Sequence, residues 1–175
     1  KYREEGYDAE NGEQEIARIR RKRSSLGAIN ATAIEESVIL KERYEEMTSQ
    51  KEDLEKAKSL NVDLISVSMH WGAEYKLKPI SEQEKLADFL FENGADIILG
   101  SHPHVIEPME TRTITLEDGT TKEGFLIYSL GNFVSGQVKQ YTNHSIILNL
   151  EITKHAEGNI TIDSIDYTPI YVFTK

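Results

Sequence analysis

Polar residues predominate in the first 60 positions, and this part of the chain predicts helices. Residues 32–35 (TAIE) have the spacing of an N-terminal capping box, and Ile34 and Val38 lie one helical turn apart. We therefore predict a helix from Thr32 to about Met47.

A second capping signature, SQKE at residues 49–52, follows almost at once. It predicts a separate short helix that ends near Leu60. Residues 14–23 predict a further polar helix, which carries the basic run RIRRKR from Arg18 to Arg23. A solvated helix face is the simplest interpretation of this run, and a contact with an anionic polymer is the alternative.

The hydrophobic pattern changes at Val62, from a mostly polar sequence to short apolar runs. DLISVSM, residues 63–69, is rich in β-branched side chains and predicts a strand covered on both faces. SEQE at residues 81–84 predicts the start of a helix, Asn93-Gly94 predicts its end, and ADIILG at residues 95–100 predicts a second buried strand. This order of strand, helix and strand implies parallel pairing through a right-handed crossover.

The last third of the chain has the pattern of antiparallel pairs. Residues 111–130 predict a hairpin around Asp118-Gly119. Residues 145–152 and 159–167 predict a second pair, joined through residues 157–159. We therefore expect an α/β (α+β) fold, in which a parallel βαβ unit is followed by antiparallel hairpins.

The whole chain suits one folded domain preceded by a helical segment of unclear affiliation, residues 1–48. Its 175 residues and net charge of −10 describe an acidic chain with enough material for a core. The negative charge gives no electrostatic basis for binding nucleic acid.

The absence of cysteine excludes disulfides and thiolate metal sites. Because the sequence begins without methionine or a signal peptide, we expect it to be an excised piece of a longer protein.

Three histidines follow the two predicted parallel strands. His70 comes directly after residues 63–69, and His102 and His104 follow residues 95–100 within four positions. Because the carboxyl ends of parallel strands share one edge, about 5 Å apart, we expect the three imidazoles to converge there. Neutral imidazole suits Zn, Fe, Mn or Ni better than Ca or Mg, so the pattern indicates a metal site. A purely structural role is the alternative, above all for His70.

The two remaining histidines indicate no chemistry. His155 falls in a predicted hairpin loop, and we expect it to be solvated. His144 precedes a predicted strand, where a surface role is favoured over a ligand role.

Four ordered motifs resemble one known family. HWGAEY, GADIILGSHPHVIEPME, YSLGNFVSGQ and YTPIYV resemble the CapA family of poly-γ-glutamate capsule biosynthesis proteins, from about Asp53 to Val172. Proteins of that family are similar in fold to calcineurin-like metallophosphatases. The resemblance implies that residues 49–175 are the C-terminal part of such a domain, a β-sandwich flanked by helices. It also implies divalent Mn, Zn or Fe as cofactor.

The resemblance assigns roles to particular residues. His70 matches a single metal-binding histidine after a strand, and His102 and His104 match a Gly-His-x-His motif, here with one additional residue after the glycine. Glu74 is the candidate general base or hydrogen-bond acceptor behind a ligand. The other motif positions, which imply contacts with substrate or support of the ligands, are Trp71, Tyr75, Ser129 and Asn132. For Asn132, a turn-forming role is an equal alternative.

One departure from the family pattern matters. Metallophosphatases take further ligands from their N-terminal half, but residues 1–60 contain only Asp8 and Asp53 as aspartates and no histidine. Two divalent ions also require a carboxylate that bridges them. We therefore expect half a site, with weak or no metal binding by this chain alone.

Two functions of different class remain open. The complete protein could be a metal-dependent, phosphoesterase-like hydrolase, or a non-catalytic accessory protein that guides an anionic envelope polymer during synthesis and export. The resemblance implies the extracellular face of the bacterial envelope, with membrane contact through segments outside this chain. An unfinished sheet edge would also favour partner-strand pairing or a homodimer.

Overall fold

The computed structural model describes residues 9–25, 32–116 and 119–173. The chain divides into two compact units, Lys1–Met47 and Thr48–Lys175. The predicted turn residue Asp118 lies outside the described residues.

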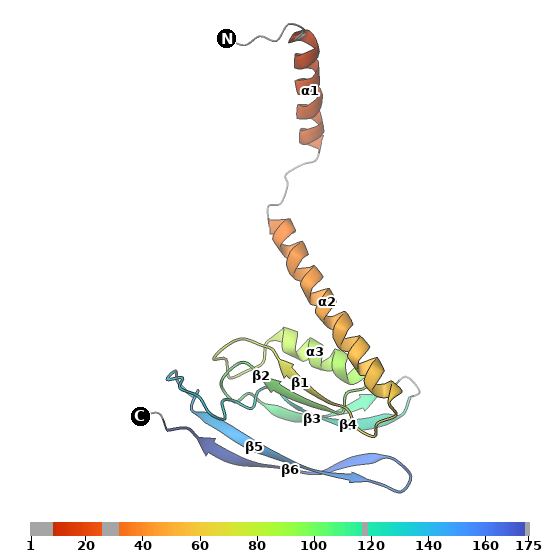
Figure 1. Ribbon diagram of the computed structural model, residues 1–175, viewed down its shortest axis with the longest axis vertical. Helices are drawn as coiled ribbons and strands as arrows, with labels where there is room; N and C mark the ends of the chain where they lie inside the picture. The colour runs from red at the N-terminus through yellow and green to blue at the C-terminus, as the bar shows by residue number, and fades with distance from the viewer. Residues whose placement is uncertain (1–8, 26–31, 117–118, 174–175) are drawn as a thin grey trace. The chain divides into compact units, whose positions relative to one another are not determined.

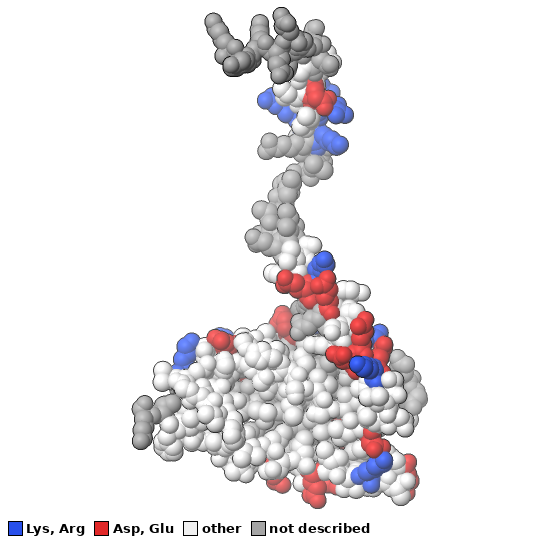
Figure 2. Space-filling view, in the orientation of Figure 1, with Lys and Arg blue, Asp and Glu red and all other residues white. Residues whose placement is uncertain are grey.

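The described residues of the N-terminal part form helices, as the polar pattern predicts. Helix α1 spans Ala9–Ser25, and its basic residues Arg18, Arg20, Arg21 and Lys22 are exposed (Figure 2). Arg18 is paired with Glu15, 2.7 Å apart, on the same helix. At least this arginine is engaged within its own helix.

Helix α2 spans Thr32–Ser59 without interruption, so the predicted boundary between two helices near residue 48 is wrong. The sequence S-x-x-E also occurs inside helices, and no Gly or Pro lies between Met47 and Ser59 to end this one. Lys51 and Glu55, 3.8 Å apart, form an exposed i,i+4 pair across the following turn. The predicted end near Leu60 is confirmed.

The central sheet has four strands in the order β1-β2-β4-β3 (Figure 1). Their bounds are Ser66–His70 for β1, Ile97–Ser101 for β2, Met109–Thr115 for β3 and Thr121–Ile127 for β4. β1 pairs with β2 in parallel, β2 with β4 in parallel, and β3 with β4 as an antiparallel hairpin. The predicted βαβ unit and hairpin are therefore confirmed.

A two-stranded sheet packs on one face of this central sheet. Strands β5, His144–Lys154, and β6, Ile160–Tyr171, pair antiparallel over their whole length (Figure 1). Ile146 of β5 packs with Ile97, Phe125 and Ile127 of the central sheet in one apolar cluster. This arrangement confirms the mixed α/β class and is consistent with part of a metallophosphatase-like sandwich.

Helix α3, Ser81–Glu92, covers the opposite face of the central sheet. Its residues Ala87, Leu90 and Phe91 are buried with Ile98 and Leu126 in a second apolar cluster. Asn93 ends the helix, as predicted.

The N-terminus of α3 differs from prediction by one residue. The capping residue is Ile80, and Ser81 is already helical. Gln83 replaces a hydroxyl cap, because its side-chain oxygen accepts a hydrogen bond from the Ile80 backbone N–H at 3.0 Å.

Strand β1 also corrects a prediction. We expected both faces to be covered, but Ser66, Ser68 and His70 are exposed and only Met69 is buried. The polar residues alternate with apolar ones, and β1 is an edge strand of the four-stranded sheet. The apolar run therefore encodes one buried face rather than two.

Candidate functional site

The carboxyl ends of β1 and β2 bring the three predicted histidines together. His70 is the last residue of β1 and lies beside Ser101, the last residue of β2. The ring centroids of His70 and His102 are 4.6 Å apart, and those of His102 and His104 are 5.9 Å apart. Parallel register thus places imidazoles from two strand ends in one cluster, which we call the histidine cluster.

The backbone around this cluster adopts unusual conformations. His102 and His104 have φ values of 102° and 62°, and Tyr75 has a φ of 65°. Such positive φ values cost non-glycine residues roughly 1–3 kcal/mol each, and they persist where the surroundings impose them. Here the Tyr75 N–H donates to the Pro103 carbonyl at 2.8 Å, which ties the two histidine-bearing loops to each other.

The two loops are also joined at their origins. The Trp71 N–H donates to the Ser101 carbonyl at 3.1 Å, and the Ser101 hydroxyl donates to the Met69 carbonyl at 2.9 Å. These bonds extend the parallel ladder past the strand ends. The positions of His70 and His102 are therefore coupled through the backbone.

His104 has the most complete polar surroundings of the three. Its Nδ1 lies 3.0 Å from Asn132 Oδ1, and its Nε2 lies 3.7 Å from a carboxylate oxygen of Glu74. The Asn132 amide nitrogen donates to the Thr142 carbonyl at 2.9 Å and to Gln137 at 3.2 Å. Asn132 Oδ1 is therefore the acceptor, so Nδ1 of a neutral His104 carries the proton and Nε2 has a free lone pair.

Tyr75 and Glu74 lie beside this imidazole. The ring of Tyr75 stacks on His104, with centroids 5.8 Å apart. The side chain of Glu74 is about half exposed, at 49%. Two of the three candidates that follow His70 in the HWGAEY motif, Glu74 and Tyr75, thus lie beside the histidine cluster.

Trp71 and Ser129 are buried beneath the histidine cluster, unlike Glu74. Trp71 is buried in the core beside α3, and its indole N–H donates to the Tyr128 carbonyl at 2.9 Å. Ser129 is fully buried, and its hydroxyl oxygen accepts from the Gly131 N–H at 3.3 Å. Their contacts support the backbone under the site rather than line its surface.

The other two histidines have contacts of their own. His155 lies in the hairpin turn, with Nε2 2.9 Å from the Thr161 hydroxyl. His144 begins β5, is exposed, and packs edge-on against Tyr171 with centroids 5.1 Å apart.

Sequence reasoning missed two features near the cluster. Lys139 places its ammonium 3.6 Å from the centroid of the Tyr75 ring, a cation–π contact. Glu107, three residues after His104, is a buried carboxyl that bonds Gln83. The motif SHPHVIEP contains Glu107, but burial is a tertiary property that the motif alone does not reveal.

The cluster does not form a complete metal site by itself. Within residues 9–25, 32–116 and 119–173, no group of three or more His, Asp or Glu side chains is arranged so that it could bind a metal ion. The imidazoles are the right donor type for Zn, Mn or Fe, and the Asn132 contact prepares one lone pair. Neither the three imidazoles nor the nearby Glu74 carboxylate are arranged to bind one ion in the described residues, and two divalent ions would in addition need a carboxylate that bridges them.

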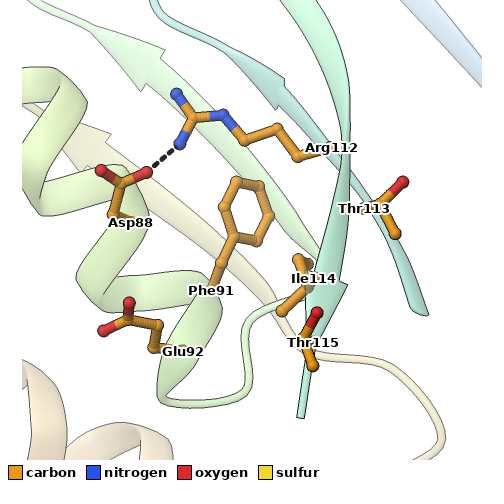
Figure 3. Close-up of a pocket in the computed structure, with 7 residues that line it drawn as sticks. All are labelled: Asp88, Phe91, Glu92, Arg112, Thr113, Ile114 and Thr115. Atoms are coloured by element: carbon orange, nitrogen blue, oxygen red, sulfur yellow. Dashed lines mark hydrogen bonds and ion pairs between the residues drawn. The ribbon is translucent and has the colours of Figure 1, made fainter. Parts of the chain in front are cut away.

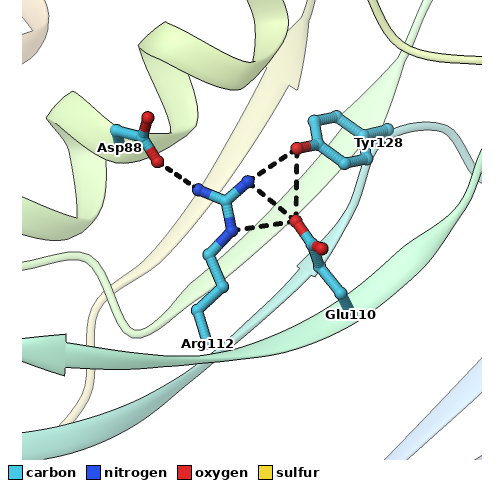
Figure 4. Close-up of polar contacts among 4 residues, drawn as sticks. All are labelled: Asp88, Glu110, Arg112 and Tyr128. Carbon is cyan, nitrogen blue, oxygen red and sulfur yellow. Dashed lines mark hydrogen bonds and ion pairs between the residues drawn. The ribbon is translucent and has the colours of Figure 1, made fainter.

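A second polar cluster lies between α3 and the β3–β4 hairpin (Figure 4). The Arg112 guanidinium pairs with Asp88, donates to Glu110 at 2.8 Å and donates to the Tyr128 hydroxyl at 2.7 Å. Burial raises the pKa of Tyr128 to about 12, so the hydroxyl stays protonated and donates to Glu110. A cavity of about 260 Å³ adjoins Arg112 and Phe91 (Figure 3).

The sequence places this mixed α/β protein in a family. Residues 2–137 match the family described as "Bacterial capsule synthesis protein PGA_cap". The match covers well over half of the chain, and the chain belongs to that family. It begins at residue 2, and so includes nearly all of residues 1–48.

Two curated relatives agree with the family. The chain is 38% identical over 106 residues to the PGA biosynthesis protein CapA of Bacillus subtilis (strain 168), which is 61% of this chain and 26% of that protein. It is 40% identical over 92 residues to the capsule biosynthesis protein CapA of Bacillus anthracis, which is 53% of this chain and 20% of that protein. The chain thus matches about a quarter or less of these relatives. No solved structure matches it.

Among the residues that the structure describes, no helix combines the length and apolar character that crossing a bilayer requires.

Proposed function

We propose that this chain is part of an envelope protein of poly-γ-glutamate capsule synthesis, and that its histidine cluster supplies one side of a divalent metal centre. The observation that carries the proposal is the convergence of His70, His102 and His104 at one sheet edge. Membership of the capsule synthesis family supports the pathway. The CapA names of the two relatives support the polymer class.

His70, His102 and His104 would bind the metal, and carboxylates from outside this chain would complete the ligand set. Asn132 supports this role of His104, because a ligating imidazole commonly donates its other N–H to a fixed acceptor. Three neutral imidazoles leave the cation's charge uncompensated, so the missing ligands must be anionic.

In the complete protein we expect a metal-dependent, phosphoesterase-like hydrolase. A bound Mn, Zn or Fe ion would supply Lewis acidity and an activated water. Glu74, half exposed and next to His104, is placed to accept a proton near the cluster. Tyr75 packs on His104 and restricts the orientation of its ring.

A second function, that of a non-catalytic guide for an anionic polymer, is favoured by Lys139. Its ammonium is exposed and contacts Tyr75, which in turn stacks on His104. A cation at this place would attract carboxylate or phosphate oxygens to the cluster even without turnover, in a chain whose net charge of −10 otherwise repels them.

One experiment separates the two functions. We expect the full-length protein with Mn²⁺ or Zn²⁺ to hydrolyse a chromogenic phosphoester, and His102→Ala or His104→Ala to reduce turnover to background. His155→Ala is the matched control and should retain full activity, because this ring bonds only the hairpin residue Thr161 in the described structure. Polymer binding without turnover in the wild-type protein would reject the hydrolase and support the guide.

The open edge of β1 suggests a partner as well. β1 is an outer strand of the four-stranded sheet, with its Ser66 and Ser68 exposed. We propose that another strand pairs there, from the remainder of the protein or from a second copy. A sedimentation measurement on the 175-residue chain that shows a monomer at all concentrations would exclude the second copy.

We propose the cell envelope, on its extracellular face, as the location. Membrane contact would come from segments outside this chain. Fractionation of cells that express the full-length protein, followed by protease treatment of intact cells, tests this location.

A further inference from the structure

A buried polar pair lies where three loops of the candidate site meet. Gln83 of α3 and Glu107 of the loop after β2 are exposed by only 1% and 2%. The Gln83 amide nitrogen donates to Glu107 Oε2 at 2.8 Å. Neither residue has a role in the proposed chemistry.

The Gln83 end of the pair restrains the loop after β1. The amide oxygen accepts from the Ile80 N–H at 3.0 Å, at the end of that loop. At its beginning, Gly72 has a φ of +88°, and a Cβ there would lie 2.7 Å from the Gln83 side-chain amide. Gln83 therefore packs directly against the backbone two residues after His70.

The Glu107 end restrains the other two loops. The Glu107 N–H donates to the Ser129 carbonyl at 3.1 Å, and the neighbouring Ile106 forms a β-bridge with Leu130. Residues 102–107 contain both histidines of the second loop, whereas Ser129 and Leu130 lead into the loop of Asn132. The pair thus joins the backbone segments that carry all three imidazoles and the acceptor for His104.

The properties of this pair indicate that it positions the loops rather than stabilises the folded state. Burial raises the pKa of Glu107, and its Oε1 has no hydrogen-bond partner among the described residues. A desolvated carboxyl with one free oxygen costs folding free energy that an apolar side chain would not. Glu107 provides a directional hydrogen bond to Gln83, which an apolar side chain could not form.

We propose that the Gln83–Glu107 hydrogen bond is a positioning device that sets His102 and His104 relative to His70. The effect of this hydrogen bond on activity rests on the proposed function. The geometric claim can be tested without any activity.

The test is an NMR measurement of imidazole ring signals in the 175-residue chain. In Glu107→Ala, we expect the ring signals of His102 and His104 to shift or broaden while the ring signals of His155 stay unchanged. In Glu107→Gln, we expect signals close to wild type, because an amide oxygen still accepts from Gln83. Unchanged His102 and His104 signals in a folded Glu107→Ala protein would overturn the proposal.

Two further variants guard against a simple loss of stability. Ile114→Ala removes a buried side chain from the core beside α3, and it should lower stability without moving the histidine signals. Gln83→Met keeps a side chain of similar length and removes both hydrogen bonds. If Glu107→Ala does not fold, Gln83→Met provides the test. Unchanged His102 and His104 ring signals in a folded Gln83→Met protein would then refute the positioning role of the hydrogen bond.

Activity of the full-length protein then separates the two proposals. If the protein is a hydrolase and the device exists, Glu107→Ala should lower kcat and Glu107→Gln should restore it. If the wild-type protein shows no turnover, the hydrolase is rejected, but the ring signals still decide whether the device exists.

Discussion

The histidine cluster and the second polar cluster, which is centred on Arg112, lie on the same sheet and differ in how many of their polar groups have partners. Around Arg112, the acceptors Asp88, Glu110 and Tyr128 all engage the guanidinium (Figure 4). In the histidine cluster, the rings of His70 and His102 have no hydrogen-bond partner among the described residues.

The backbone differs in the same direction. Arg112 lies in the regular β3–β4 ladder, opposite Gly124. His102 and His104 have positive φ values that cost free energy. A closed ion-pair network in regular structure contributes to stability, whereas a strained cluster with free ring nitrogens is available for a ligand. Predictions that separate stability from function therefore test this comparison most directly.

The largest expected effect is on activity. His104→Ala in the full-length protein should abolish metal-dependent turnover and leave the free energy of unfolding within about 1 kcal/mol of wild type. The reason is that the variant removes a proposed metal ligand but keeps a Cβ at the same positive φ, so the backbone strain is unchanged. Parallel turnover and urea-unfolding measurements check this, and a large stability loss would contradict the comparison.

The next effect is on stability. Arg112→Ala should lower the free energy of unfolding by about 1–2 kcal/mol, because the buried Tyr128 hydroxyl loses its charged donor. The exposed Glu110 contributes little to this loss. Urea unfolding measures the loss. Arg18→Ala, at an exposed pair on α1, is the control and should change stability by less than about 0.5 kcal/mol.

Asn132→Ala should weaken metal binding through its effect on His104. Without the acceptor at Nδ1, the favoured tautomer is lost, and the affinity of the full-length protein for Zn²⁺ should fall about 10–100-fold. Calorimetric titration with Zn²⁺ measures the affinity. Asn132→Asp keeps the acceptor and should lose less, so equal losses in the two variants would reject the tautomer argument.

The pH dependence of stability tests Glu107. Because burial raises its pKa above 4.5 in the folded chain, folding takes up a proton there. This carboxyl therefore favours the folded state below pH 4.5, and the contribution is lost as pH rises through the folded pKa. Glu107→Gln should remove this part of the pH dependence. Free energies of unfolding of both proteins, measured between pH 4 and pH 7, would show the difference. The same dependence on pH in both proteins would contradict this prediction.

The smallest expected effect concerns polymer binding. Lys139→Ala should weaken binding of poly-γ-glutamate a few-fold at low salt and hardly at all at high salt, because the ammonium is exposed and screened. Lys154→Ala, which removes a lysine paired with Asp63, is the matched control. Equal effects of the two variants would mean that the net charge, and not the position beside Tyr75, attracts the polymer.

The sequence by itself determined the order of elements and the place of the histidines. Apolar runs and turn residues encode β1, α3, β2 and both hairpins locally, and parallel pairing then places the two strand ends side by side. Local patterns were less informative about where a helix continues. SQKE in α2 and Ser81 in α3 both have cap chemistry, yet the first is helix interior and the second lies one residue past the cap.

Only the tertiary structure decided burial and partners. It exposed one face of β1, buried Glu107 against Gln83, and placed Asn132 and Lys139 around His104 and Tyr75. These contacts join residues 24 to 64 positions apart in the chain, and no local period or propensity records them. Hydrophobic spacing fixes which segments become strands and helices, but the free energy of a polar side chain depends on neighbours that only the folded chain brings into contact.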